Sequence, residues 1–143
     1  MEYYSPFSAE ELAVRLRKIR HVALDMDGTI YLGATLFPWT IAFLEGLKAQ
    51  GIGYSFLTNN PSQSLGDYLH KLERMGISAK PDEMYTTAVA MVDFLKTHHP
   101  DVKKLFLLGT PSMISQFERA GFVSTADDPA DEPDAVIVAF DKT

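Results

Sequence analysis

Short apolar runs along the chain predict a set of buried strands. The clearest run, Val22, Ala23 and Leu24, sits between a histidine and an aspartate. Runs this short and continuous are typical of a parallel sheet that is covered on both faces. The feature recurs along the chain, and we expect strands at residues 21–25, 53–58, 83–86, 103–109 and 135–140.

Between these runs, apolar residues recur at spacings of three and four, which indicates amphipathic helices. Ser8 and Glu11 have the spacing of a capping box at the start of the first helix. We expect that helix to pack on the sheet through Leu12, Leu16 and Ile19. The predicted helices cover residues 9–18, 38–50, 63–75, 87–97 and 111–120.

Strands that alternate with helices in this order predict an α/β fold, with a parallel sheet flanked by helices. We also expect a particular N-cap residue for the third helix and burial of two aromatic side chains in the second. Ser62 is well suited to be the N-cap of the third helix. Trp39 and Phe43 should lie in the core, because aromatic residues on a helix are more often buried than in contact with a ligand.

Composition narrows the class of protein. With 143 residues, of which 46% are hydrophobic and 22% charged, the chain can bury a real core as a soluble globular protein. The net charge of −6 argues against binding nucleic acid through its phosphates. The chain has no cysteine, no apolar run long enough to span a bilayer, and no signal-peptide pattern at its start. We therefore expect a cytoplasmic protein with neither a membrane nor a nucleic-acid partner.

Candidate chemistry lies where the first strand ends. Asp25 and Asp27 follow the apolar run directly, and ligands in open α/β sheets bind just past the carboxyl ends of the strands. Strand alternation points residues i and i+2 to the same side, so the two carboxylates start out close together. Their mutual repulsion is relieved by a hard cation such as Mg²⁺, which prefers oxygen ligands. One carboxylate could then attack phosphorus while the other moves the proton.

Uncharged donors accompany these acids. Gly28 lets the backbone turn tightly and brings N–H groups close to an anion. Thr58, Asn59 and Asn60 end the second strand, where they can hold a phosphoryl oxygen without adding charge. Taken singly, each of these residues is more often a helix cap or a turn residue. Together they predict a phosphate site.

Two motifs resemble signatures of one known family. Residues 24–33, Leu-Asp-Met-Asp-Gly-Thr-Ile-Tyr-Leu-Gly, resemble the first signature of the haloacid dehalogenase (HAD) superfamily, whose members are mostly Mg²⁺-dependent phosphatases. Residues 56–60, Phe-Leu-Thr-Asn-Asn, resemble its second signature. The details are similar to the subgroup of nitrophenyl-phosphatase and pyridoxal-phosphatase-like enzymes, which carry a large cap domain. The resemblance runs from about residue 19 to the end of the chain.

The resemblance implies a Rossmann-like core and a phosphomonoester hydrolase that acts on small phosphorylated metabolites. Asp25 would attack phosphorus and form an aspartyl-phosphate, and Asp27 would be the general acid and base. Mg²⁺ would be the cofactor, held by Asp25 and by the backbone carbonyl of Asp27. Thr58 and Asn59 would hold the phosphate together with Gly28, and Asn60 would orient the nucleophile loop.

The chain also departs from the family pattern. A lysine and a late acidic signature, which lie beyond the cap in the family, have no match here. We therefore expect an N-terminal portion of a longer phosphatase, with residues 1–100 in the core domain and 101–143 beginning an α/β cap. Without the other ligands Mg²⁺ should bind weakly, so this chain alone should be inactive or weakly active. An open half-sheet should also make it prone to associate, which leaves a homo-oligomer open.

Two other functions compete with the enzyme. A non-catalytic module could bind phosphate or a protein partner with the same fold. A phosphoacceptor signalling domain also uses strand-end acids and Mg²⁺, but Thr58, Asn59 and Asn60 fit it less well. We expect surface turns rather than metal sites at His98 and His99 and along the acidic loop 127–134. The sequence leaves the physiological substrate undetermined.

Overall fold

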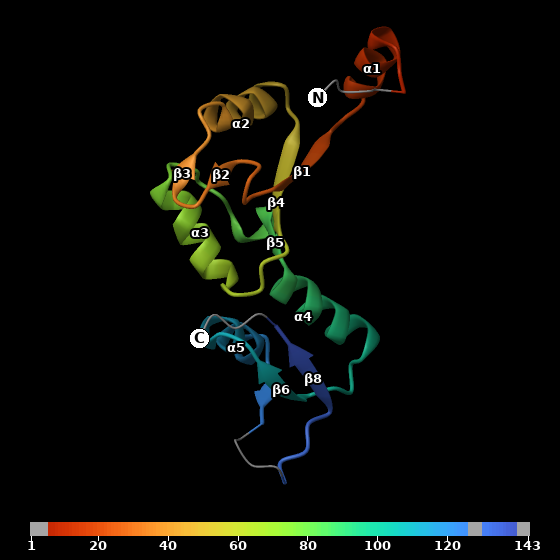
Figure 1. The fold of residues 1–143 in the computed structure, drawn as a ribbon. Helices are drawn as coiled ribbons and strands as arrows, with labels where there is room; N and C mark the ends of the chain where they lie inside the picture. The colour runs from red at the N-terminus through yellow and green to blue at the C-terminus, as the bar shows by residue number, and fades with distance from the viewer. Residues whose placement is uncertain (1–5, 126–129, 140–143) are drawn as a thin grey trace.

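The computed structural model describes residues 6–125 and 130–139. The molecule is elongated, with helix α1 (Ala9–Leu16) at one end and the sheet that contains strand β6 (Lys104–Leu108) at the other (Figure 1). The described helices include none that is long and apolar enough to cross a bilayer.

A three-stranded parallel sheet forms the first unit. Its strands lie in the order β1 (His21–Asp25), β4 (Gly53–Thr58) and β5 (Met84–Thr86). The register pairs Asp25 with Leu57, so the polar ends of β1 and β4 reach the same edge. A short antiparallel hairpin, β2 (Tyr31–Leu32) and β3 (Thr35–Leu36), follows β1 beside this edge.

Helices cover one face of this sheet. Helices α2 (Thr40–Ala49) and α3 (Leu65–Arg74) lie on the same side of β1 and β4 (Figure 1). The core between them is made of apolar side chains from both layers, among them Leu24, Leu44, Leu47, Tyr54, Phe56, Tyr68, Leu72 and Met84. On the opposite face Leu57 and Tyr85 are exposed.

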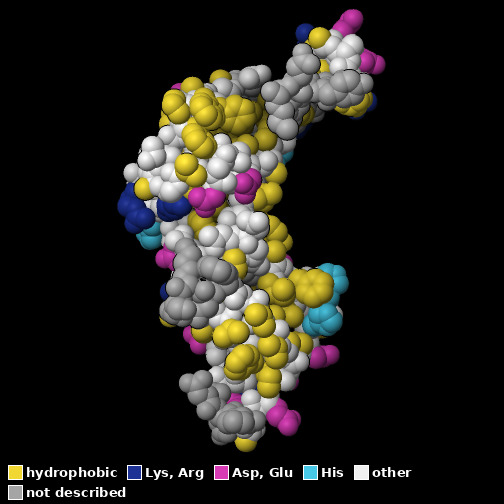
Figure 2. Space-filling model, in the orientation of Figure 1, with side chains coloured by type: hydrophobic (Ala, Val, Ile, Leu, Met, Phe, Trp, Pro, Cys, Tyr) yellow, Lys and Arg dark blue, Asp and Glu magenta, His cyan; other side chains and the backbone are white. Residues whose placement is uncertain are grey.

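A second parallel sheet, in the order β7 (Val123–Ser124), β6 and β8 (Ala135–Val138), forms the other unit. Helices α4 (Thr87–His98) and α5 (Pro111–Arg119) pack against it around Leu105, Met113, Phe117 and Phe122. In the first unit, a short 3-10 turn, η1 (Pro81–Glu83), precedes β5. Apolar side chains also gather on the surface of this unit (Figure 2); the exposed ones on its strands are Phe106, Leu108, Val123, Val136 and Val138.

Polar contacts tie the two units together. The Thr110 hydroxyl donates a hydrogen bond to the Ser62 carbonyl at 2.9 Å. The Leu65 N–H donates to Oε1 of Gln116 at 2.8 Å. One contact joins the loop before α3 to the N-cap of α5, and the other joins the first residue of α3 to the middle of α5. The second unit therefore helps to hold the loop that follows β4.

The predicted α/β fold with a parallel sheet flanked by helices is confirmed, and each expected helix and strand is present within the described residues. The structure adds β7, and it forms the two short strands β2 and β3 in the segment 28–37, where the family resemblance implies a loop and hairpin. Residues 127–129 of the acidic loop, and Phe140 of the last predicted strand, lie outside the described residues.

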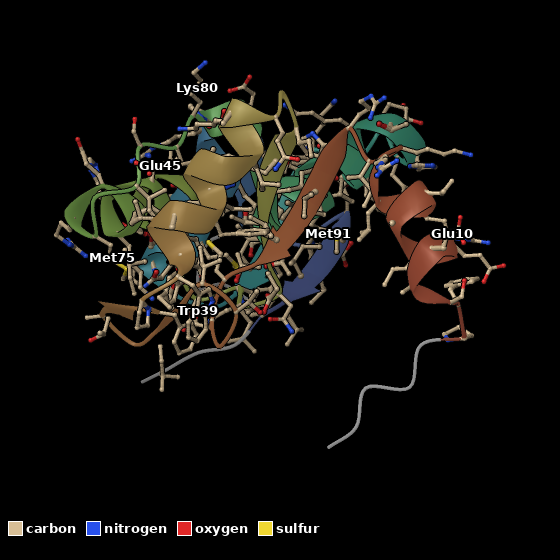
Figure 3. All side chains as sticks on the ribbon, turned by 90° about the horizontal axis from the view of Figure 1, so that it is seen from above. Glu10, Trp39, Glu45, Met75, Lys80 and Met91 are labelled. Carbon is tan, nitrogen blue, oxygen red and sulfur yellow. The ribbon has the colours of Figure 1, made fainter. Side chains whose placement is uncertain are left out.

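Helix α1 is capped as expected but does not pack on the sheet. Ser8 accepts a hydrogen bond from the Glu11 N–H, and Glu11 accepts one from the Ser8 N–H. None of its residues is buried, and Leu16 is 53% exposed. Glu10 marks this helix, which stands apart from the packed body in Figure 3. The amphipathic pattern predicted a helix correctly, but a pattern does not specify a partner.

Two finer expectations are wrong. Ser64, not Ser62, is the N-cap of α3, because Asp67 completes a capping box with Ser64. Trp39 precedes α2, stacks on Phe37 with ring centroids 4.9 Å apart and is 59% exposed, and Phe43 is exposed as well. Thr40 takes the buried position there and donates to the Ile30 carbonyl at 2.6 Å.

The division into core and cap domains stays a prediction. The buried side chains form two clusters, and α4 contributes Ala88, Val92 and Leu95 to the second one. Packing therefore groups α4 with the second unit, whereas the predicted boundary at residue 100 groups it with the first.

Candidate active site

The turn after β1 presents two carboxylates. Asp25 is the last residue of β1, and Asp27 follows after Met26, whose side chain is fully buried. The Met26 carbonyl accepts hydrogen bonds from the N–H groups of Thr29 and Ile30, at 3.1 and 3.0 Å. This buried anchor holds the turn while both aspartates stay exposed.

Gly28 makes the turn possible. Its φ is +80°, in the left-handed region that side chains other than glycine's rarely adopt. Its N–H donates to the Tyr31 carbonyl at 2.8 Å. That N–H is therefore already used within the turn, and a phosphate-binding role for Gly28 stays a prediction.

Each carboxylate has one neighbouring hydroxyl. The Thr29 hydroxyl donates to Oδ2 of Asp25 at 3.3 Å, and the Tyr31 hydroxyl lies 3.5 Å from Oδ2 of Asp27. Both contacts are long, so most of the hydrogen-bonding capacity of the two carboxylates is open to a ligand.

The end of β4 is held by a chain of hydrogen bonds. The Thr58 hydroxyl accepts from the Asn60 N–H at 3.2 Å, and Oδ1 of Asn60 accepts from the Ser62 N–H at 3.0 Å. The Tyr68 hydroxyl of α3 donates to the Asn60 carbonyl at 3.1 Å. Asn60 is therefore committed to shaping the loop, whereas Asn59 is exposed.

The ends of strands β1 and β4 border one cavity of about 440 Å³. Eight polar side chains line it: Asp25, Asp27, Thr58, Asn59, Asn60, Gln63, Tyr68 and Lys71. Every predicted site residue except Gly28 therefore lies around the same space.

Three lining residues were not predicted: Gln63, Tyr68 and Lys71. Gln63 lies in the loop before α3, whereas we expected it in the first turn of that helix. Tyr68 and Lys71 are three residues apart on α3, a spacing that places both on one face of a helix. That spacing was a usable signal, but the predicted helix faces took account of apolar residues alone.

Burial and negative charge keep the site tyrosines protonated. Burial, followed by the charge of Asp27, raises the pKa of Tyr31 well above its usual range. Burial also raises the pKa of Tyr68, and Asp27 adds to the effect. At neutral pH both phenols therefore act as hydrogen-bond donors beside the carboxylates.

The donor set fits a magnesium ion that is only partly enclosed by protein. Asp25 and Asp27 offer carboxylate oxygens on one side of the cavity, and Mg²⁺ in phosphoryl-transfer sites is often held by one or two carboxylates, substrate phosphate and water. Within residues 6–125 and 130–139 no group of three or more His, Asp or Glu residues could hold a metal. The two aspartates are therefore the candidate ligands.

Comparison with known proteins places the chain in a family. A sequence profile described as haloacid dehalogenase-like hydrolase matches residues 22–123. An acid sugar phosphatase of Staphylococcus aureus is 28% identical over 127 residues, which cover 89% of this chain and 48% of that protein.

Solved structures have the same fold. A 4-nitrophenylphosphatase of Thermotoga maritima superposes with a TM-score of 0.80 and 38% identity, over 90% of this chain and 47% of the other. A glycerol phosphate phosphatase of Mycobacterium tuberculosis, solved in complex with magnesium, superposes with a TM-score of 0.74 over 89% of this chain and 38% of the other; at 22% identity it supports the fold alone.

The chain spans about half the length of the curated relatives that it matches. The matched profile nevertheless covers β1 from Val22 onward, β4, β5 and every residue that lines the cavity described above. It also covers well over half of the chain, and the protein therefore belongs to the family of haloacid dehalogenase-like hydrolases.

Proposed function

We propose that the protein is a Mg²⁺-dependent phosphomonoester hydrolase for small phosphorylated metabolites, or a part of one. One observation carries the proposal: two strand-end carboxylates, Asp25 and Asp27, share a polar cavity with the uncharged donors Thr58 and Asn59. Similarity to proteins named as phosphatases supports it. We also propose that the protein is located in the cytoplasm.

The reaction would begin with an in-line attack. A carboxylate oxygen of Asp25 forms a bond to phosphorus, and the bond from phosphorus to the leaving oxygen breaks. Asp27, protonated for this step, gives its proton to the leaving oxygen. The products are an aspartyl-phosphate on Asp25 and a free alcohol.

Hydrolysis would then restore the protein. Asp27, now a carboxylate, accepts a proton from a water molecule that attacks phosphorus. The bond between Asp25 and phosphorus breaks, and inorganic phosphate leaves. Through both steps the Thr58 hydroxyl and a donor from Asn59 hold phosphoryl oxygens.

A divalent cation fits this scheme. Held by the Asp25 carboxylate and the backbone carbonyl of Asp27, Mg²⁺ would act as a Lewis acid and offset the negative charge of Asp25 and the phosphate, which leaves the Asp27 carboxyl free to move the proton. Because the described residues provide only these two candidate acidic ligands, we still expect weak magnesium binding and weak turnover by this chain alone.

The test is hydrolysis of p-nitrophenyl phosphate, with and without Mg²⁺, by the chain and by its Asp25→Asn variant. Metal-dependent turnover that the variant loses would support the proposal, and robust turnover would contradict our expectation of weak activity. Turnover that survives in Asp25→Asn would refute the nucleophile assignment. Stable labelling of Asp25 by acetyl phosphate, without hydrolysis, would instead favour a phosphoacceptor domain.

A non-catalytic phosphate-binding module is the second candidate. The observation that favours it is the lack of a third acidic or histidine ligand among the described residues near Asp25 and Asp27. Equilibrium binding of inorganic phosphate, measured together with the turnover assay above, separates the two candidates, because the module would bind phosphate without turning over any monoester.

A further inference from the structure

Lys71 brings a positive charge into the cavity that the proposed reaction does not use. It lies in the second turn of α3 and lines the cavity together with Asp25 and Asp27. It is the single basic side chain among the described lining residues. The question is therefore which group this ammonium ion binds in a cavity whose other charged side chains are two carboxylates.

The ammonium group is held without being neutralised. Nζ of Lys71 lies 3.9 Å from the centroid of the Tyr31 ring, a cation–π geometry. Within the part of the chain that the structure describes, no carboxylate lies at ion-pair distance from Lys71. Among the described residues Lys71 also donates no hydrogen bond, so the N–H donors that do not face the ring remain open to a ligand.

The position of Lys71 indicates which part of the substrate it would meet. Tyr31, on which Lys71 rests, points its hydroxyl at Asp27 rather than at Asp25. In the proposed reaction Asp27 protonates the leaving oxygen, so the leaving group lies on the Asp27 side of the cavity. The phosphate itself lies at the strand ends, beside Asp25 and Thr58.

We propose that Lys71 is a specificity-determining residue that binds a second anionic group, carried on the leaving-group side of a phosphomonoester. This inference rests on the proposed function. The preferred substrate class is then a small phosphorylated acid rather than a neutral sugar or polyol phosphate. A charge-assisted contact of this kind corresponds to about tenfold in affinity.

Two probes of matched shape test this. Glycerol 3-phosphate and 3-phosphoglycerate share one skeleton, and 3-phosphoglycerate carries a carboxylate where the other carries a hydroxymethyl group. Their dissociation constants for the chain would be measured by calorimetry in the presence of Mg²⁺. We expect 3-phosphoglycerate to bind about tenfold more tightly, since only it can reach Lys71 with a second charge.

Three variants assign the preference to the Lys71 charge. Lys71→Met keeps an unbranched apolar stem over the Tyr31 ring, and it should lose the preference while glycerol 3-phosphate binds as before. Lys71→Arg keeps the charge and should keep the preference. Lys48→Met is the matched control, because Lys48 also lies over a tyrosine ring, at 5.7 Å from that of Tyr54, but does not line the cavity.

The outcomes separate the inference from the proposed function. If both probes bind the unaltered chain equally, or if Lys71→Met keeps the preference, the inference is wrong and the phosphatase proposal stands. If Lys71→Met weakens both probes alike, Lys71 serves the phosphate or the fold and the inference is again wrong. If neither probe binds the unaltered chain at all, the proposed function fails and the inference fails with it.

Discussion

The Asp67 carboxylate of α3 accepts a hydrogen bond from the Ser112 hydroxyl of α5, 45 residues further along the chain. The same oxygen, Oδ2, accepts from the N–H and the hydroxyl of Ser64, at 2.9 and 2.8 Å. One carboxylate therefore both caps α3 and joins the two units next to the loop that carries Asn60 and Gln63.

We expect Asp67→Ala to lower the free energy of unfolding at pH 7 by about 1 kcal/mol, the usual effect of losing a helix cap. Burial acts to raise the pKa of Asp67, but the hydrogen bonds from Ser112 and Ser64 outweigh it and hold the pKa below its usual range. A carboxylate with a lowered pKa stabilises the fold above its unfolded pKa and ceases to do so as pH falls through the folded value.

The difference in the free energy of unfolding between the unaltered chain and Asp67→Ala should therefore shrink as pH falls below about 4. Urea unfolding at pH 7 and at pH 3 measures it. Asp93→Ala is the control, because Asp93 is exposed on α4 and its removal should matter little at either pH. A difference that grows on acidification would contradict the role of the Asp67 carboxylate.

The same substitution should change the free energy of unfolding by very different amounts at two leucines on different helices. Leu72 of α3 is fully buried, and Leu72→Ala should cost about 2–5 kcal/mol of unfolding free energy. Leu16 of α1 is 53% exposed, and Leu16→Ala should change it by less than about 0.5 kcal/mol. Denaturant titration of both variants checks this. A large loss for Leu16→Ala would mean that α1 packs on the body after all.

Thr58→Val tests the hydroxyl at the end of β4. The substitution keeps the shape but removes an acceptor for the Asn60 N–H and the proposed donor to phosphate. Inorganic phosphate should bind about tenfold more weakly in the presence of Mg²⁺, as for one lost hydrogen bond to a charged group. Thr35→Val, on the exposed hairpin, should leave phosphate affinity unchanged; an equal loss there would point to a general effect.

Gly28→Ala tests the turn that carries Asp27. A Cβ at Gly28 would meet no atom within 4 Å, so its effect comes from backbone strain at a φ of +80°. We expect a loss of about 1 kcal/mol in unfolding free energy. Gly46→Ala is the matched control, since Gly46 lies in α2 with equally open surroundings and its replacement should stabilise the helix. Equal effects at the two glycines would refute the strain argument.

Local patterns were sufficient for the elements and for the strand-end acids. The apolar run before Asp25, and that before Thr58, identified two parallel strands whose polar ends meet at one edge, because side-chain alternation and the position of sites in α/β sheets are properties of short segments. Capping residues likewise located the start of α1, since a capping box is contained in four consecutive positions.

Contacts between distant segments decided the rest. The amphipathic pattern of α1 could not indicate that its apolar face stays exposed, because burial depends on what the remainder of the chain places beside it. Ser64 and Asp67 already had the spacing of a capping box in the sequence, which the choice of Ser62 overlooked, and only the contact from Ser112 to Asp67 depends on the tertiary structure. The sequence by itself determined the α/β class and the acids; only the tertiary structure placed Lys71 over Tyr31 beside them, because that contact joins α3 to a hairpin forty residues earlier.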